Sequence, residues 1–169
     1  LLTRKANYGV ATISGEAVAA SEGDRYSFLN SMTTEIDGVM RSVGDSISRN
    51  LFRDGSGAIG RVNNSSFSTT GLDLVTDMDS LNFEVGMVLQ LAATKSGGSV
   101  RSGTLTVSAV NRGATSSQIT LSGNISAGVS AVAQNDYIYQ SGDYDGALTG
   151  LEGWLPATAP DSTAFFGQD

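Results

Sequence analysis

The longest periodic segment of the chain, SEGDRYSFLNSMTTEIDGVMRSVGDSISRNLF from Ser21 to Phe52, predicts a single amphipathic helix. Its apolar residues recur at steps of three and four, which places them on one stripe of a helix with a 3.6-residue period. They are Phe28, Leu29, Met32, Ile36, Val39, Met40, Val43, Ile47 and Leu51. At about 1.5 Å per residue the helix would be on the order of 45 Å long, more than the usual three or four turns. We therefore expect a beam that carries smaller parts, with its apolar stripe covered by strands of the same chain.

Both ends of this segment carry helix-end signals. Ser21 and Asp24 resemble a capping box with Asp in place of Glu, and acidic residues suit the positive end of the helix dipole. Arg49 and Arg53 suit the negative end. The sequence DGSG at residues 54–57 is expected to stop the helix, because glycine adopts the left-handed conformation that closes helices.

Glycines inside and after the helix allow two interpretations each. Gly38 and Gly44 cost about 1 kcal/mol each in a helix interior, and they indicate either a slight bend or the close approach of a neighbouring backbone. The sequence GSGAIG, with Gly55, Gly57 and Gly60, matches the dinucleotide-binding pattern GxGxxG. That motif requires a strand before it and a helix after it, whereas here a helix precedes. We interpret it as a helix stop and a turn that leads into a strand.

The periodicity changes to two between about Phe67 and Tyr144. In TLTVSAV, for example, Leu105, Val107 and Ala109 share one face, as in a half-buried strand. Glycine-containing turns separate five candidate strands. These are Leu72 to Val75, Met87 to Ala92, Thr104 to Val110, Gln118 to Leu121 and Asp136 to Gln140. Short strands at regular spacing, without helices between them, predict a small antiparallel β-barrel or sandwich.

The two ends of the chain are less regular. Tyr8, Val10, Thr12 and Ile13 predict a short strand that Gly15 ends. Near the other end, one or two turns of helix are expected before Pro156, at Leu148, Leu151, Trp154 and Leu155. Trp154, Phe165 and Phe166 should pack on the long helix, on residues beyond Asp169 or on another subunit, because alone they would expose much apolar area.

These patterns predict an α+β fold in three parts. Residues 1–57 hold the N-terminal strand and the long helix, residues 58–145 form a β-rich insertion module, and residues 146–169 hold a short helix and an extended tail. The chain begins LLTRKANYGV, without an initiator Met or a signal segment, so we expect a piece of a longer protein.

Composition excludes several classes of function. The 169 residues contain no Cys and no His, which excludes disulfides, thiolate and histidine catalysis, and zinc sites built on these residues. A formal charge of −7 argues against a protein that reads nucleic-acid sequence, because such proteins usually carry a basic patch. The sequence contains no run of eighteen apolar residues, so it predicts no transmembrane helix.

Two groups of carboxylates could hold a hard cation such as calcium. One group is Asp73, Asp77 and Asp79, and the other is Asp136, Asp143 and Asp145. Neither group has the glycine and glutamate positions of an EF-hand, and Asp is also a common turn residue, which we favour here. Nothing in the sequence selects a catalytic pair of acids of the kind that a glycosidase needs. We predict no catalytic residue, no metal site and no cofactor.

Other polar and aromatic motifs are weaker signals. Asn64 and Asn124 stand in N-x-S/T sequons, which mean little without a secretion signal. Tyr137 and Tyr139 alternate with Ile138, either as an aromatic platform for a sugar or base or as a strand with one core face.

Four phrases of the sequence resemble the major capsid proteins of tailed bacteriophages with the Johnson-type capsid fold. They are LFRDGSGAIGRV after the long helix, NFEVGMVLQL in the strand-rich stretch, QNDYIYQSGDYDG, and GLEGWLP soon after it. The resemblance implies a long spine helix in a peripheral domain, a small β-rich insertion and no catalytic residues. A full subunit of that family is considerably longer, so an N-terminal arm and most of an axial domain would lie outside this chain.

The leading hypothesis is therefore a structural protein of the virion, assembled in the bacterial host cytoplasm. Copies of the subunit would build an icosahedral shell around double-stranded DNA, without sequence-specific DNA contacts, membrane or small-molecule substrate. The alternatives are a surface β-module that binds a glycan or receptor, and a metal-dependent carboxylate enzyme.

Overall fold

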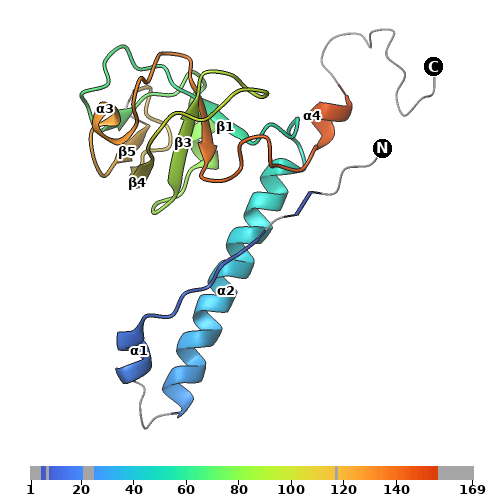
Figure 1. Ribbon diagram of the computed structural model, residues 1–169, viewed down its shortest axis with the longest axis vertical. Helices are drawn as coiled ribbons and strands as arrows, with labels where there is room; N and C mark the ends of the chain where they lie inside the picture. Colours follow the sequence, from blue (N-terminus) through green and yellow to red (C-terminus); the bar gives the residue numbers. More distant parts are fainter. Residues whose placement is uncertain (1–4, 7, 21–24, 117, 156–169) are drawn as a thin grey trace, which may run out of the picture.

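The computed structural model describes residues 5–6, 8–20, 25–116 and 118–155. One long helix stands beside a six-stranded antiparallel sheet, so the fold is α+β (Figure 1). The helices are α1 (Gly15–Ala20), α2 (Arg25–Asn50), the 3₁₀ helix η1 (Asp77–Asn82), α3 (Ile125–Gly128) and α4 (Leu151–Trp154). The strands are β1 (Ala58–Arg61), β2 (Gly71–Leu72), β3 (Val88–Ala92), β4 (Leu105–Val110), β5 (Ile119–Leu121) and β6 (Tyr137–Gln140).

The predicted long helix is confirmed as α2, which contains 26 residues. The helical hydrogen bonds continue one residue further, since the Leu51 amide donates to the Ile47 carbonyl over 2.9 Å. The chain then turns through Gly55 and Gly57, both with positive φ, as the DGSG stop predicted. The proposed cap at Ser21 and Asp24 lies outside the described residues.

The N-terminal strand prediction is wrong. Residues 8–14 form no regular element, and Gly15 begins α1 instead of ending a strand. The segment runs alongside α2 (Figure 1), where Gly9 packs so closely on Val39 and Val43 that a Cβ atom would clash with both side chains. Glycine is needed at this crossing because the Val39 and Val43 side chains leave no room for a Cβ atom.

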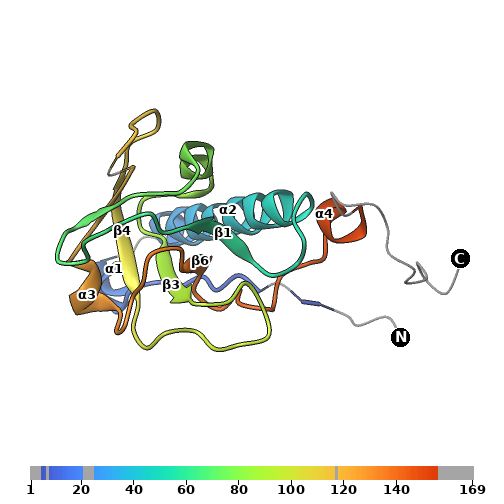
Figure 2. The same ribbon diagram turned by 90° about the horizontal axis from the view of Figure 1, so that it is seen from above.

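All five predicted strands are confirmed within two or three residues, and the turn after GSG leads into a sixth strand, β1. The sheet has the order β1-β6-β3-β4-β5-β2, and every pairing is antiparallel. It curls into a half-barrel, which lies to one side of α2 (Figure 2). Of the predicted small barrel or sandwich, the structure therefore shows one curled antiparallel sheet and not two packed sheets.

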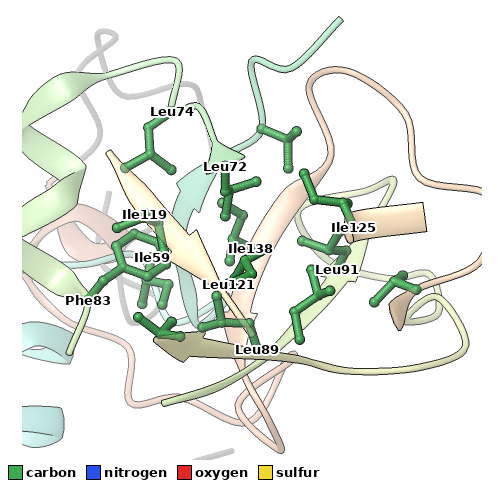
Figure 3. Close-up of a cluster of buried hydrophobic side chains, with 14 residues drawn as sticks. Ile59, Leu72, Leu74, Phe83, Leu89, Leu91, Ile119, Leu121, Ile125 and Ile138 are labelled. Atoms are coloured by element: carbon green, nitrogen blue, oxygen red, sulfur yellow. The ribbon is translucent and has the colours of Figure 1, made fainter. Parts of the chain in front are cut away.

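The apolar core lies inside the half-barrel. Alternating residues of the strands point inward and meet Phe83 from the segment after η1 and Ile125 from α3 (Figure 3). The buried cluster comprises Ile59, Val62, Leu72, Leu74, Phe83, Leu89, Leu91, Leu105, Val107, Ile119, Leu121, Ile125, Val129 and Ile138. None of these residues belongs to α2, so the module holds its own core and does not use the helix to complete it.

The two interior glycines of α2 lie in open space. A Cβ atom added to Gly38 or Gly44 would meet nothing within 4 Å, so no neighbouring backbone approaches the helix there. Of the two interpretations of these glycines, close approach is therefore wrong.

Because a Cβ atom has room at both positions, alanine should be tolerated at Gly38 and Gly44. We expect Gly38→Ala and Gly44→Ala each to raise the free energy of unfolding by about 1 kcal/mol, because alanine loses less backbone entropy in a helix. Urea unfolding followed by far-UV circular dichroism measures the change. Gly9→Ala, which introduces the clash with Val39 and Val43, is the matched control and should destabilise the chain. Destabilisation by the two helix substitutions would contradict the prediction.

Candidate assembly surface

The predicted carboxylate groups do not form sites. Asp77 accepts a hydrogen bond from the Gln118 side chain over 2.9 Å, while Asp79 lies 3.9 Å from the Arg53 guanidinium. Within the described part of the chain, no group of three or more acidic side chains is placed to hold a metal ion. Burial raises the pKa of the Asp79 carboxyl, and Arg53 opposes this effect only partly.

The second carboxylate group is dispersed in the same way. Asp136 is buried and pairs with Arg101 through two hydrogen bonds of 2.5 and 2.7 Å. Asp145 accepts a hydrogen bond from the Gly97 amide in a neighbouring loop. Burial raises the pKa of the Asp143 carboxyl, an effect that the nearby Arg49 opposes. Asp145 thus links two loops, whereas Asp136 forms a buried ion pair with Arg101 that its interpretation as a turn residue did not include.

The tyrosines of β6 do not form an open aromatic platform. Tyr139 is fully buried, and its hydroxyl donates to the carbonyl oxygens of Thr94 and Lys95. Its ring meets that of Tyr144 edge-on, with the centroids 5.0 Å apart. Tyr137 is half-buried beneath the Arg61 guanidinium, which lies 4.8 Å from the ring centroid.

Asn64, the asparagine of the first sequon, joins the two edges of the sheet. It is 3% exposed, and its side chain donates to the Gly71 carbonyl and accepts from the Asp73 amide, both over 2.8 Å. Two backbone hydrogen bonds complete this seam between the two edges. The Asn63 amide donates to the Asp73 carbonyl, and the Val75 amide donates to the Arg61 carbonyl. Asn124, from the other sequon, is exposed before α3.

The outer edge of β1 is also covered. The carbonyl of Ala58 accepts from Arg53 over 2.5 Å, and that of Ile59 accepts from the Asn82 side chain over 3.0 Å. An unpaired strand edge is a template for pairing with another chain, and side-chain donors remove that possibility. Side-chain donors thus occupy the carbonyl groups of Ala58 and Ile59 along this edge.

We expect Asn64→Ala to lower the free energy of unfolding by about 2 kcal/mol, because it leaves the buried Gly71 carbonyl and the part-buried Asp73 amide without this partner. The neighbouring Asn63→Ala is the matched control. Asn63 is exposed and should change stability by less than about 0.5 kcal/mol. Chemical denaturation of both variants measures the difference, and equal stabilities would show that the side chain does not close the seam.

The C-terminal end of α2 is attached firmly to the module and to α4. The amides of Gly150 and Leu151 donate to the carbonyls of Arg53 and Leu51, both over 2.8 Å. Gly150 passes so close to the helix end that a Cβ atom would clash with the carbonyl oxygens of Asn50 and Leu51. The last carbonyl groups of the helix thus receive donors from the returning chain, as a buried helix end requires.

Charged side chains reinforce this junction. Arg49 donates to the Asn82 carbonyl over 2.9 Å and to the Gln140 side chain over 3.3 Å. Lys95 lies 2.7 Å from Asp54 and 3.8 Å from Glu152, so one cation in the loop after β3 links the turn after α2 to α4. Burial alone would raise the pKa of Asp54, but hydrogen bonds from Lys95 and Ser56 outweigh it and lower that pKa. The sequence suggested dipole partners in Arg49 and Arg53, but no pattern pointed to Lys95.

The apolar stripe of α2 is exposed over most of its length, so the prediction that strands of this chain cover it is wrong. We call the exposed residues the α2 ridge. The ridge comprises Leu29, Met32, Ile36, Met40, Val43, Ile47 and Leu51; Val43 is half-buried beside Gly9, and the other six are 40–68% exposed. Apolar side chains aligned along one face of a helix usually mark a contact with another molecule or domain.

Trp154 is 40% exposed on α4, and its ring nitrogen donates to the Thr149 carbonyl. The short helix predicted there is confirmed, but Phe165 and Phe166 lie outside the described residues.

A hollow of about 370 Å³ opens between the N-terminal segment and the loop after β6, with Lys5, Tyr8 and Asp143 among its lining residues. Its lining mixes polar residues with apolar ones such as Ala147 and Leu148.

Comparison with protein-family models, with curated proteins and with solved structures gave no match. Among the helices of the described residues, none has the length and apolarity to cross a membrane. The helix–module junction and the α2 ridge are therefore the features from which a function must be argued.

Proposed function

We propose that this chain is a structural protein, a subunit of an icosahedral shell of the tailed-bacteriophage type that assembles around double-stranded DNA. The observation that carries the proposal is the α2 ridge, which leaves six large apolar side chains exposed on a rigid helix. Such a surface suits permanent contacts, because burying it removes apolar area from water on every subunit of an assembly.

The junction supports the same proposal. A shell needs subunits whose parts keep fixed relative positions, and here backbone hydrogen bonds, two arginines and Lys95 attach the module to the helix end. In this proposal α2 is the spine of the subunit, and the half-barrel is an insertion on the outer surface or between subunits. Its covered strand edges suit this role, since they prevent uncontrolled pairing of one module with another.

Three of the four phrases that resemble capsid proteins lie at this junction, and the fourth, NFEVGMVLQL, leads into β3. LFRDGSGAIGRV follows α2 and forms the turn and β1, while QNDYIYQSGDYDG forms β6 and the return toward the helix. GLEGWLP begins at Gly150, where the chain contacts the helix end again. An insertion module must leave and re-enter its parent domain at neighbouring points, and residues 51–55 and 149–151 provide such a pair of points.

In this proposal the partners are copies of the same chain, and packaged DNA is enclosed without sequence-specific contact. Expression of the protein in bacteria followed by negative-stain electron microscopy tests the assembly. Shells, or curved sheets of regularly repeated subunits, are the expected result. Only monomers or small closed oligomers under all assembly conditions would contradict the proposal.

A further inference from the structure

The hollow beside the C-terminal end of α2 has walls from three separate segments of the chain. Lys5 and Tyr8 come from the N-terminal segment, Asn50 is the last residue of α2, and Ser141 and Asp143 lie in the loop after β6. Its volume of about 370 Å³ falls within the range of small-molecule sites, roughly 300 to 1,000 Å³. Residues far apart in the sequence thus meet on one concave surface.

Asn50 is a buried polar residue that the fold itself does not use. It is 5% exposed, and its backbone carbonyl accepts from the Arg53 amide, but its side-chain amide has no hydrogen-bond partner among the described residues. No fully buried side-chain nitrogen or oxygen in the described part of the chain lacks a partner, so the Asn50 amide must be reached from the hollow. Because burying an amide without a partner is costly, such a group indicates a bound molecule.

Asp143 and Lys5 add charged groups to the same lining. The Gly146 amide donates to the backbone carbonyl of Asp143, so this turn forms without the Asp143 carboxyl group. Lys5 donates to the Asp145 carbonyl over 2.5 Å, which leaves two of its three N–H groups for a ligand. The hollow therefore presents an acceptor at Asp143, donors at Lys5 and an amide with both at Asn50.

This combination of groups disfavours most classes of small molecule. An anion would meet the Asp143 carboxylate and a net charge of −7. A metal cation would meet the Lys5 ammonium, with Asp143 as the single acid among the described lining residues. An apolar molecule would leave the Asn50 amide unpaired. A neutral polyol fits all three residues, because each of its hydroxyl groups both donates and accepts a hydrogen bond.

Tyr8 narrows the class of polyol to a sugar ring. Its side chain is 84% exposed and lines the hollow, so a flat aromatic face is open to a ligand at this point. Aromatic rings pack on the apolar C–H face of a ring while their hydroxyl groups stay at the wet edge. Tyr8, Ser141 and Asp143 also line an adjoining hollow of about 240 Å³ under the N-terminal segment, which gives room for a second ring.

We propose that the hollow binds a neutral hexopyranose, with Asn50 and Asp143 bonding to ring hydroxyls and Tyr8 covering one face of the ring. Lys5 and Ser141 bond to the remaining hydroxyls. This inference goes beyond the proposed function, because a sugar binds here whether or not the chain belongs to a shell. Shells without sugar binding would overturn only the sugar site, and sugar binding without shells would overturn only the proposed function.

Saturation-transfer difference NMR of the full chain tests the site and applies to single chains and to large assemblies alike. The probes are D-glucose, D-galactose, D-mannose and N-acetyl-D-glucosamine, each measured separately. At least one of them should receive saturation on its ring protons, whereas glycerol, which has hydroxyls but no ring, should receive at least tenfold less. Absence of saturation on all four sugars would overturn the proposal, and so would equal saturation of glycerol.

Substitutions locate the bound sugar. Asn50→Ala should weaken binding about tenfold or more, as expected for a lost buried hydrogen bond. The same variant should keep or raise the urea midpoint of unfolding, because the Asn50 amide has no partner among the described residues. Tyr8→Ala should weaken binding about threefold to tenfold. The controls Asn63→Ala and Tyr26→Ala alter exposed residues outside the hollow and should bind normally. Unchanged affinity in Asn50→Ala or in Tyr8→Ala would overturn the site.

Discussion

Replacing Arg101 with methionine is expected to lower the free energy of unfolding by about 3 to 5 kcal/mol. Arg101 donates two hydrogen bonds to Asp136, whose side chain is only 3% exposed. Methionine fills similar volume but leaves the carboxylate with the Ala133 amide as its remaining described donor. A buried charge without its partner costs far more than the pair itself contributes to stability.

The comparison with Asp136→Asn separates the two effects. In the double variant Arg101→Met with Asp136→Asn, the uncompensated charge is removed, and most of the lost stability should return. Arg112→Met is the matched control, because Arg112 is exposed and donates one hydrogen bond to the Phe83 carbonyl. It should cost at most about 1 kcal/mol. Urea unfolding of the unmodified chain, the two single variants, the double variant and the control measures the coupling, and a loss below 1 kcal/mol in Arg101→Met would contradict the prediction.

Gly57→Ala is expected to destabilise the chain by about 3 kcal/mol or more. Gly57 has φ +83°, a conformation that costs other residues roughly 1 to 2 kcal/mol. In addition, a Cβ atom there would lie closer than 3 Å to the carbonyl group of Asp143 in the returning chain. Because the new Cβ atom would meet backbone atoms of Asp143 and not a flexible side chain, the clash can be relieved only by separating β1 from the loop after β6.

Gly86→Ala is the control for the backbone conformation alone. Gly86 has φ +88°, nearly the same as Gly57, but a Cβ atom there would meet nothing within 4 Å. We expect it to cost about 1 kcal/mol. The difference between the two variants in thermal or urea unfolding measures the close approach at the junction. Equal effects would mean that the turn conformation alone explains the need for glycine.

The conformations of Gly55 and Gly57 also explain why the sequence GSGAIG resembles a nucleotide-binding motif. The positive φ values of Gly55 and Gly57 let the chain turn sharply after α2 and pass close to residues 143 and 149. The requirement is the same as in a phosphate-binding loop, since both need a tight turn and close approach. Here the close neighbours are Thr149 and Asp143 of the same chain.

Local sequence patterns determined where the long helix, one central strand and the helix-ending turn lie in this chain. The steps of three and four in residues 28–51 predicted α2, the alternation in TLTVSAV predicted β4, and DGSG predicted the end of the helix. Each of these signals lies within one element, where backbone geometry and side-chain periodicity act over a few residues. The absence of Cys and His likewise excluded whole classes of chemistry without any structure.

Only the tertiary structure decided which surfaces those elements bury. The apolar stripe of α2 predicts burial, yet the half-barrel fills its own core from its strands, η1 and α3 and leaves the α2 ridge exposed. The roles of Asn64, Lys95 and Arg101 also required the fold, because their partners are separated from them in sequence and meet only when the sheet curls. Periodicity tells which face of an element is apolar, but it carries no information about which distant segment, or which second copy, covers that face.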